Sequence, residues 1–234
     1  MNITVDGKIF SKYGDVKVGA LKVADFNCTD EFIELSQAKA ENAISKFNEM
    51  ISGKTIEEFE GVNYWKKIFS QMGGPASRVS SIENLYRLID EWKALPQIHP
   101  IVDYYNAISC MSGIPMGAYD TDKIVGNITV REAAKGEFFF PMGLNQVEKT
   151  KNEEVIYADD ERVTCRYWNN KDSDLTKVDA GTKNVVFVFD VSPEVPTEYL
   201  EGIIGDMAAE LKTAKVSDRI YYGIIDKDNR TIEF

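Results

Sequence analysis

Two different residue periodicities divide this chain, and they constrain its fold more than any other feature. Up to residue 113, apolar residues recur at helical spacing behind recognisable helix starts. After residue 127, short β-like runs are separated by turn residues. Strands and helices do not alternate regularly, so the pattern argues against a Rossmann fold. It predicts a mixed α+β fold with a helix-rich first half packed on a strand-rich second half.

The expected helices are marked by capping and first-turn signals. A helix begun by Thr29 ends at Gly53, and a helix begun by Pro100 ends at Gly113. Ser or Thr followed three residues later by Glu forms a capping box at two further starts, Thr55 with Glu58 and Ser80 with Glu83. A last helix is expected from about residue 196 to residue 212.

The expected strands are residues 16–26, 127–131, 137–140, 154–158, 162–168 and 184–191. Asp6-Gly7 predicts a tight hairpin between residues 3–5 and 9–10. A closing hairpin is expected from residues 220–225 and 231–234 around a turn at 226–229. No linker or repeat interrupts the 234 residues, of which 44% are hydrophobic, so a single domain over residues 1–234 is expected.

Charge and cysteine usage limit the partners and the compartment. A net charge of -11 argues against broad, non-specific binding to nucleic acid, so no DNA partner is expected. No apolar run is long enough for a bilayer and the N-terminus has no signal core, which predicts no membrane association. Three cysteines without a Cys-x-x-Cys pair fit a reducing compartment. The expected location is the cytoplasm.

Familiar catalytic motifs do not occur in this sequence. A P-loop, a Gly-x-Gly-x-x-Gly fingerprint, a His-Glu-x-x-His motif and a Gly-x-Ser-x-Gly elbow are all missing. The single histidine, His99, excludes a multi-histidine metal site, and beside Pro100 it is expected to cap a helix. Cys110 and Cys165 fall in apolar segments and are expected to be buried, inert thiols. Neither a metal nor a cofactor is expected, and composition and spacing do not identify an enzyme.

Several polar clusters allow two interpretations. Arg78, Ser80 and Glu83 surround a helix start and form either a cap with a surface arginine or part of a binding site. Asp120 with the following Asp122 and Lys123 is either a turn or a site.

Further along, residues 159–161 are interpreted as a hairpin turn with a solvated acidic face. Arg162 and Arg166 are expected on one face of a strand because their spacing is even. They are either surface charges or groups that stack on bases.

Three ordered motifs follow Pro100. Residues 102–109 read VDYYNAIS, residues 113–120 read GIPMGAYD and residues 122–131 read DKIVGNITVR. Gly136-Glu137 and residues 182–185 (TKNV) come later. This order resembles the B3/B4 editing module in the β subunit of bacterial phenylalanyl-tRNA synthetase. That module carries V-D-x-T-N-Y-V-M, G-x-P-L-H-A-F-D, D-K-I-x-G-x-I-x-V-R, G-E and T-x-N-V in the same order.

Outside these motifs, the chain is still closer to stand-alone B3/B4 proteins. Residues 80–83 (SSIE), 141–143 (PMG) and 165–169 (CRYWN) match segments typical of those proteins. The resemblance implies a B3/B4-like fold with a family core at about residues 78–191. It also implies a trans-acting aminoacyl-tRNA deacylase, which hydrolyses the ester of mischarged tRNA with a positioned water.

The resemblance assigns roles to particular positions. Asn106 would hydrogen-bond the aminoacyl group, and Gly117 and Gly143 would let backbone approach the ligand. Arg131 and Arg166 would contact the acceptor end of the tRNA, and Glu83 or Asp120 would bind the ammonium group. The full set of expected substrate-binding residues is Arg78, Ser80, Glu83, Asp120, Arg131, Arg166, Asn169 and Thr182. The pocket is expected between the helix that bears Asn106 and the strands that bear Arg131, Gly143 and Arg166.

Departures from the family pattern keep an alternative open. Tyr105 stands where the module has threonine, Gly117 replaces its histidine, and residues 169–171 (NNK) replace a glycine-glycine-acid segment. The substrate is therefore expected to differ from mischarged tyrosine. The alternative is a non-catalytic module that binds RNA, an amino-acid-like metabolite or a protein, and the missing histidine favours it. A basic groove at the pocket would favour the deacylase, and an acidic face would favour the metabolite or the protein.

Overall fold

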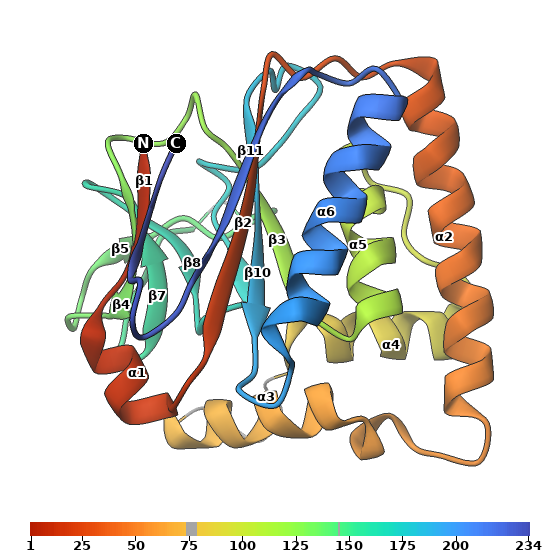
Figure 1. Cartoon of the computed structure of the whole chain (residues 1–234). Coiled ribbons are helices and arrows are strands. Elements are labelled where there is room, and N and C mark those ends of the chain that lie inside the picture. The colour runs from red at the N-terminus through yellow and green to blue at the C-terminus, as the bar shows by residue number, and fades with distance from the viewer. Residues whose placement is uncertain (74–78, 145) are drawn as a thin grey trace.

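The computed structural model describes residues 1–73, 79–144 and 146–234 (Figure 1). Arg78 lies outside these residues. The helices are α1 (Gly7–Tyr13), α2 (Asp30–Ile51), the short 3-10 turn η1 (Ile56–Glu58), α3 (Glu60–Gln71), α4 (Ser81–Trp92), α5 (Pro100–Ser112) and α6 (Thr197–Thr213). The strands are β1 (Asn2–Val5), β2 (Lys17–Ala24), β3 (Met116–Asp120), β4 (Ile128–Glu132), β5 (Phe138–Phe139), β6 (Glu148–Lys149), β7 (Val155–Ala158), β8 (Val163–Arg166), β9 (Lys171–Asp172), β10 (Val185–Val191), β11 (Arg219–Ile225) and β12 (Thr231–Glu233).

The strands form two main sheets and one small hairpin. One sheet has the order β12-β1-β4-β7-β8-β9 and the other has the order β11-β2-β10-β3, while β5 pairs only with β6. Helices α2, α5 and α6 stand together on one side of the four-stranded sheet, and α3 and α4 lie across its lower end in Figure 1. The expected mixed α+β fold is confirmed.

Strand β10 is buried along its whole length and separates two apolar cores. Alternate side chains of a strand point to opposite faces. Phe187 and Phe189 therefore join the core beneath α2, α5 and α6, whereas Val186 and Val188 join the core that reaches the six-stranded sheet. Strand β10 is thus covered on both faces, which explains why it is almost entirely apolar.

The helix starts follow the capping signals of the sequence. Thr29 Oγ1 accepts a hydrogen bond from the amide of Phe32 at 3.0 Å, and Thr55 with Glu58 forms the full capping box. His99 caps α5 through Nδ1, as expected. Gly113 ends α5 with a φ of 72°, a left-handed conformation that glycine adopts without steric cost.

Two of the expected hairpins are wrong. Asp6-Gly7 starts helix α1 instead of a turn, because the Asp6 carboxylate accepts the amide of Lys8 at 2.8 Å and serves as an N-cap. The turn at residues 226–229 does form. However, β11 pairs with β2 and β12 pairs with β1, so the two closing strands enter different sheets. Each closing strand therefore pairs with a strand from the start of the chain: β11 with β2 and β12 with β1.

The described helices include none that is both long enough and apolar enough to cross a membrane.

The position of β2 generates a test of the single-domain prediction. β2 lies between β11 and β10, so a fragment that begins at Pro100 lacks the strand that joins them. We expect this fragment to be unfolded by circular dichroism and rapidly digested by protease. A stable, folded fragment that starts near Pro100 would contradict the single domain.

Candidate functional site

A cavity of about 720 Å³ opens beside α5. Its walls come from α4, from α5, from one face of β3 and from the segment of residues 169–180. Of the sequence-predicted site residues, the cavity brings together Ser80, Asn106 and Asn169. Its apolar walls are formed mainly by Leu85, Leu88, Ile98, Val102, Met116, Ala118, Met142 and Val178. A concave space of this size, in which apolar walls surround polar side chains, is typical of a small-molecule site.

Asn106 faces this cavity from α5 and is half-buried. Its side-chain amide makes no hydrogen bond with any described residue, whereas most buried polar groups are bonded. Its neighbours Tyr104 and Ala107 are fully buried, so the helix is held firmly by its other face. The helix therefore holds the Asn106 amide at the cavity while its N–H and C=O groups stay available to a ligand.

Asp172 is a functional candidate that the sequence reasoning missed. It lies on β9, it lines the cavity, and its carboxylate forms no ion pair with a described residue. The thiol of Cys165 hydrogen-bonds to this carboxylate, and the ring of Tyr105 lies near it. Burial raises the pKa of Asp172 above its ordinary value because no nearby cation offsets the loss of water. An unpaired carboxylate in an apolar cavity is suited to bind a cationic group.

The rim of the cavity is held by contacts between α4 and residues 169–170. Ser80 Oγ caps α4 by accepting the amide of Glu83 at 3.3 Å, and the Asn170 side chain donates to the carbonyl of Val79 at 2.6 Å. The Asn169 amide approaches the carboxylate of Asp190, yet neither of its side-chain polar atoms makes a hydrogen bond of normal geometry. Asn169 is therefore a second amide of this cavity without a hydrogen-bond partner of normal geometry among the described residues.

Glu83 lies away from this cavity. Its side chain is 1% exposed and forms ion pairs with Arg87 at 2.7 Å and with Lys66 at 3.3 Å. The capping box is consequently half formed, because the Glu83 carboxylate turns toward these cations instead of the start of α4. Its arrangement is that of a structural ion pair.

Asp120 and Thr182 are brought together, but they bond to each other. Thr182 Oγ1 donates to the Asp120 carboxylate at 2.8 Å, and the same carboxylate accepts the amide of Asp122. Lys123 lies 3.2 Å from Asp120. This network fastens the end of β3 to the start of β10.

The two predicted arginines are also committed within the protein. Arg131 forms a two-pronged ion pair with Glu137 at 2.7 and 2.8 Å. Arg166 is 4% exposed and binds Glu154 and Glu148. Arg162 also donates to a carboxylate of the chain, that of Asp159 at the turn before β8. None of these arginines lines the cavity.

The two glycines differ in their surroundings. Gly117 lies in β3 between Met116 and Ala118, which line the cavity, and an added Cβ would meet Val188 at 3.6 Å on the opposite face. Gly143 has a φ of 72° and open space around it, directly after the cavity-lining Met142.

The buried thiols match the expectation from the sequence. Cys110 and Cys165 are both buried, and burial raises the pKa of the Cys110 thiol to about 12. A thiol with so high a pKa is almost entirely protonated at neutral pH and is a poor nucleophile.

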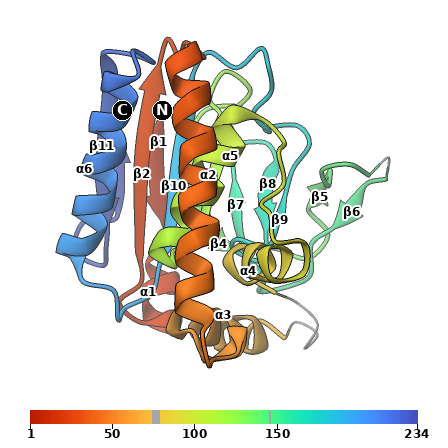
Figure 2. The same ribbon diagram turned by 90° about the vertical axis from the view of Figure 1, so that its right-hand side faces the viewer.

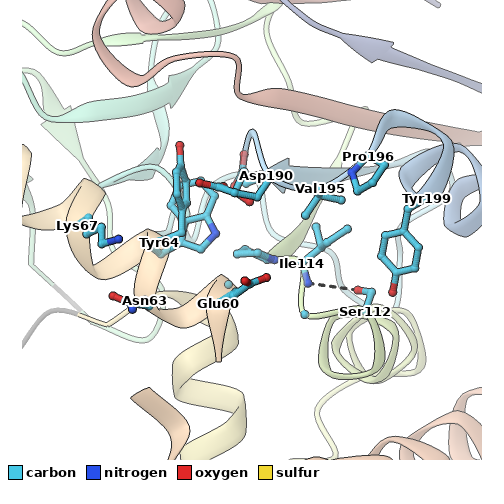
Figure 3. Close-up of a pocket in the computed structure, with 16 residues that line it drawn as sticks. Glu60, Asn63, Tyr64, Lys67, Ser112, Ile114, Asp190, Val195, Pro196 and Tyr199 are labelled. Atoms are coloured by element: carbon cyan, nitrogen blue, oxygen red, sulfur yellow. Dashed lines mark hydrogen bonds between the residues drawn. The ribbon is translucent and has the colours of Figure 1, made fainter. Parts of the chain in front are cut away.

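A second cavity of about 510 Å³ lies between α3, the end of α5, the end of β10 and the start of α6 (Figure 3). In Figure 3, Tyr64 and Glu60 of α3 face Asp190 of β10, and Tyr199 of α6 closes the far side. No described residue predicted from the sequence as part of the site lines this cavity. We therefore regard the cavity that contains Asn106 and Asp172 as the candidate functional site.

Asp190 lines the second cavity and lies near Asn169, which lines the first. Its Oδ1 accepts hydrogen bonds from Tyr157 at 2.5 Å and from Trp168 at 3.0 Å, and its carboxylate lies near Asn169. Burial raises the pKa of Asp190 to about 7, because these neutral donors only partly replace the lost hydration.

One protein family matches more than half of this chain. Residues 65–198, more than half of the chain, match the model of the B3/4 domain. The chain belongs to the B3/4 domain family. The matched segment contains α4, α5, β3 and residues 169–180, so it includes every wall of the candidate site.

Two curated proteins that resemble this chain are much longer than it is. It is 37% identical over 92 residues to a phenylalanine–tRNA ligase β subunit from Fusobacterium nucleatum, covering 39% of this chain and 11% of that protein. It is 31% identical over 90 residues to the same subunit from Corynebacterium jeikeium, covering 38% of this chain and 10% of that protein. The chain therefore spans about a tenth of the length of these relatives.

A solved structure gives a more distant similarity. An N-terminal fragment of the phenylalanyl-tRNA synthetase β subunit from Pyrococcus horikoshii aligns with 95% of this chain and 49% of its own length, with 15% identity and a TM-score of 0.45.

The raised pKa of Asp190 predicts how stability depends on pH. Because the folded state binds this proton more tightly than the unfolded chain, the Asp190 contribution is most favourable at low pH. It is lost as the pH rises from the ordinary 3.8 to about 7. An asparagine stays neutral and its oxygen still accepts from Tyr157 and Trp168.

We therefore expect Asp190→Asn to gain stability relative to the parent protein between pH 4 and pH 8, by on the order of 2–4 kcal/mol. Urea unfolding at a series of pH values measures this gain. A stability difference that does not change with pH would contradict the assignment.

Proposed function

We propose that this B3/4 protein hydrolyses the ester of mischarged aminoacyl-tRNA, with the aminoacyl group held in the cavity beside α5. The observation that carries the proposal is that two available groups line the same cavity between apolar walls. They are the Asp172 carboxylate, which has no ion-pair partner among the described residues, and the Asn106 side-chain amide, which has no hydrogen-bond partner among them. An aminoacyl ester presents the complementary groups: an ammonium, a carbonyl and a side chain. The similarity to phenylalanine–tRNA ligase β subunits supports tRNA as the carrier.

The residues of the cavity would act by binding and orientation. Asp172 would pair with the ammonium group, and Asn106 would hydrogen-bond the carbonyl region of the ester. Leu85, Val102 and Met116 would enclose an apolar side chain. Together these contacts would fix the ester relative to an attacking water, which removes much of the entropic part of the barrier.

The chemical step needs no protein nucleophile. Water adds to the ester carbonyl, the bond from the carbonyl carbon to the ribose oxygen breaks, and that oxygen takes up a proton. The free amino acid and the tRNA leave. His99, the single histidine of the chain, is committed to the cap of α5, where its Nδ1 accepts the amide of Ile101 at 3.3 Å. The proposed role of the protein is therefore positioning.

A second candidate function is the binding of a free amino-acid-like metabolite. The charged side chains that line the cavity are Asp172, Asp179 and Lys177, and Lys177 is paired with Asp174. Acidic side chains therefore outnumber basic ones among the described residues of the cavity lining, whereas a basic groove would favour an RNA substrate. Calorimetry with free amino acids and their amides, beside a deacylation screen of mischarged tRNAs, separates the two functions. Tight binding of the free compounds without ester hydrolysis would favour the metabolite.

Asn106→Ala tests the amide. Loss of one neutral hydrogen bond is worth about 1 kcal/mol, so kcat/KM for deacylation is expected to fall about fivefold, and further if the bond tightens in the transition state. The fold should survive because Asn106 makes no hydrogen bond with a described residue. Asn63→Ala, in the second cavity, is the matched control and should leave deacylation unchanged. An unfolded Asn106→Ala variant, or one with full activity, would exclude this role.

Asp172→Asn tests the carboxylate. Loss of the charge should weaken binding of the ammonium group about 10- to 100-fold, which appears in kcat/KM. Melting temperature should rise, because the substitution removes a half-buried carboxylate that has no cationic partner in the described part of the chain. Asp206→Asn, at an exposed position of α6, is the control. Lower stability with unchanged kcat/KM would show that Asp172 is structural.

The independence from transition metals stays a prediction. Among the described residues no group of three or more His, Cys, Asp and Glu side chains is arranged to hold a metal ion. We expect a zinc-selective chelator to leave the deacylation rate unchanged while magnesium is kept constant for tRNA folding. Loss of activity on chelation and recovery with zinc would refute the water-positioning mechanism.

A further inference from the structure

The β5–β6 hairpin exposes an aromatic face to solvent. Phe138 pairs with Lys149 and Phe139 pairs with Glu148 in antiparallel register. Phe138 and Phe140 therefore share one face, while Phe139 is fully buried on the other face beside Arg166. Phe138 is 60% exposed and Phe140 is 37% exposed. Figure 2 shows this hairpin projecting away from the body of the molecule.

The charges around this face differ from those of the chain as a whole, which is -11. The three acidic residues of the segment 131–151 are all held in ion pairs: Glu132 with Lys12, Glu137 with Arg131, and Glu148 with Arg166 and Lys171. Three exposed lysines of the same segment form no ion pair with a described residue: Lys135, Lys149 and Lys151. Lys149 Nζ lies 5.1 Å from the centre of the Phe138 ring. The hairpin therefore combines exposed rings with uncommitted positive charge.

The aromatic face continues into the candidate functional site. The carbonyl of Phe140 accepts the amide of Asp174, and the amide of Met142 donates to the carbonyl of Asp172. Met142 lines the cavity that contains Asn106 and Asp172. A chain that lies along the hairpin thus reaches the cavity by passing over residues 140–142.

We propose that the exposed face formed by Phe138, Phe140 and Lys149 binds the single-stranded 3′ end of an RNA whose aminoacyl group enters the cavity. This inference rests on the proposed function. Aromatic rings beside lysines are a surface on which successive bases stack while the cations contact the phosphates. Residues two apart on a strand are separated by roughly 6.6 Å, about twice the 3.4 Å spacing of stacked bases. The two rings are therefore far enough apart for one base to stack between them.

One nearby charge opposes this partner. Phe138 and Phe140 border a groove of about 360 Å³ whose other wall carries Glu161 and Arg162. Arg162 is paired with Asp159, whereas Glu161 is exposed and forms no ion pair with a described residue. Its negative charge would repel a phosphate, so its removal should strengthen RNA binding.

The test measures the affinity for a short RNA hairpin with a single-stranded 3′ CCA end, by fluorescence anisotropy on the full chain. We expect Phe138→Ala and Phe140→Ala each to weaken binding about 5- to 100-fold. Lys149→Gln should weaken binding and reduce its dependence on salt, whereas Glu161→Gln should strengthen it. Tyr222→Ala on the exposed part of β11 is the matched aromatic control and should have no effect. Thermal unfolding checks that each variant keeps its fold.

The outcomes separate this inference from the proposed function. Loss of RNA affinity in the hairpin variants supports the inference even if no mischarged tRNA is hydrolysed. A wild-type protein that binds no RNA overturns it, as do hairpin variants that bind and deacylate aminoacyl-tRNA like the wild type. Binding of the hairpin face to anionic lipid vesicles, or to a protein, in preference to RNA would also overturn it.

Discussion

Burial of β10 on both faces is the constraint on which the rest of the structure depends. The strand needs apolar cover on two sides, and it receives α2, α5 and α6 on one side and the six-stranded sheet with α3 and α4 on the other. Residues far apart in the chain are brought together to supply this cover. The central sheet therefore needs strand β2 from the start of the chain and β11 from its end, and neither half is complete alone.

The otherwise apolar strand β10 contains one acid, Asp190, which is buried with the rest of the strand. Asp190 is 3% exposed, lies in β10 and lines the second cavity. Tyr157 and Trp168 supply its hydrogen bonds, and their own rings are buried in the core between the sheets. A buried carboxylate without a cation is costly. The hydrogen bond from Trp168 holds that residue in place directly before Asn169, which lines the candidate site.

Charged residues divide into two groups in this protein. Arg131, Arg166 and Glu83 are paired with opposite charges inside the chain, and removal of one partner from such a pair leaves a costly unpaired charge. Asp172 and the lysines of the β5–β6 hairpin have no such partner among the described residues. The second group, rather than the first, has charge available for a ligand. This division links the cavity, which suits an ammonium group, with the hairpin, which suits phosphates.

The sequence by itself determined the class of fold, most element positions and the family, because these depend on local periodicity, caps and ordered motifs. It also led to Asn106, Ser80 and Asn169, which line one cavity. It placed Asp6-Gly7 in the wrong element, because an Asp before a Gly suits both a turn and a helix cap.

Only the tertiary structure decided which charges are free. Arg166 and Asp172 are close in sequence and equally polar, yet one is neutralised by Glu154 and Glu148 and the other faces the cavity. Sequence spacing gave no signal for this difference, although the position of Asp172 just after residues 169–171 pointed to the right segment. The pairing of a charge depends on contacts between distant segments, and only the folded chain brings those segments together.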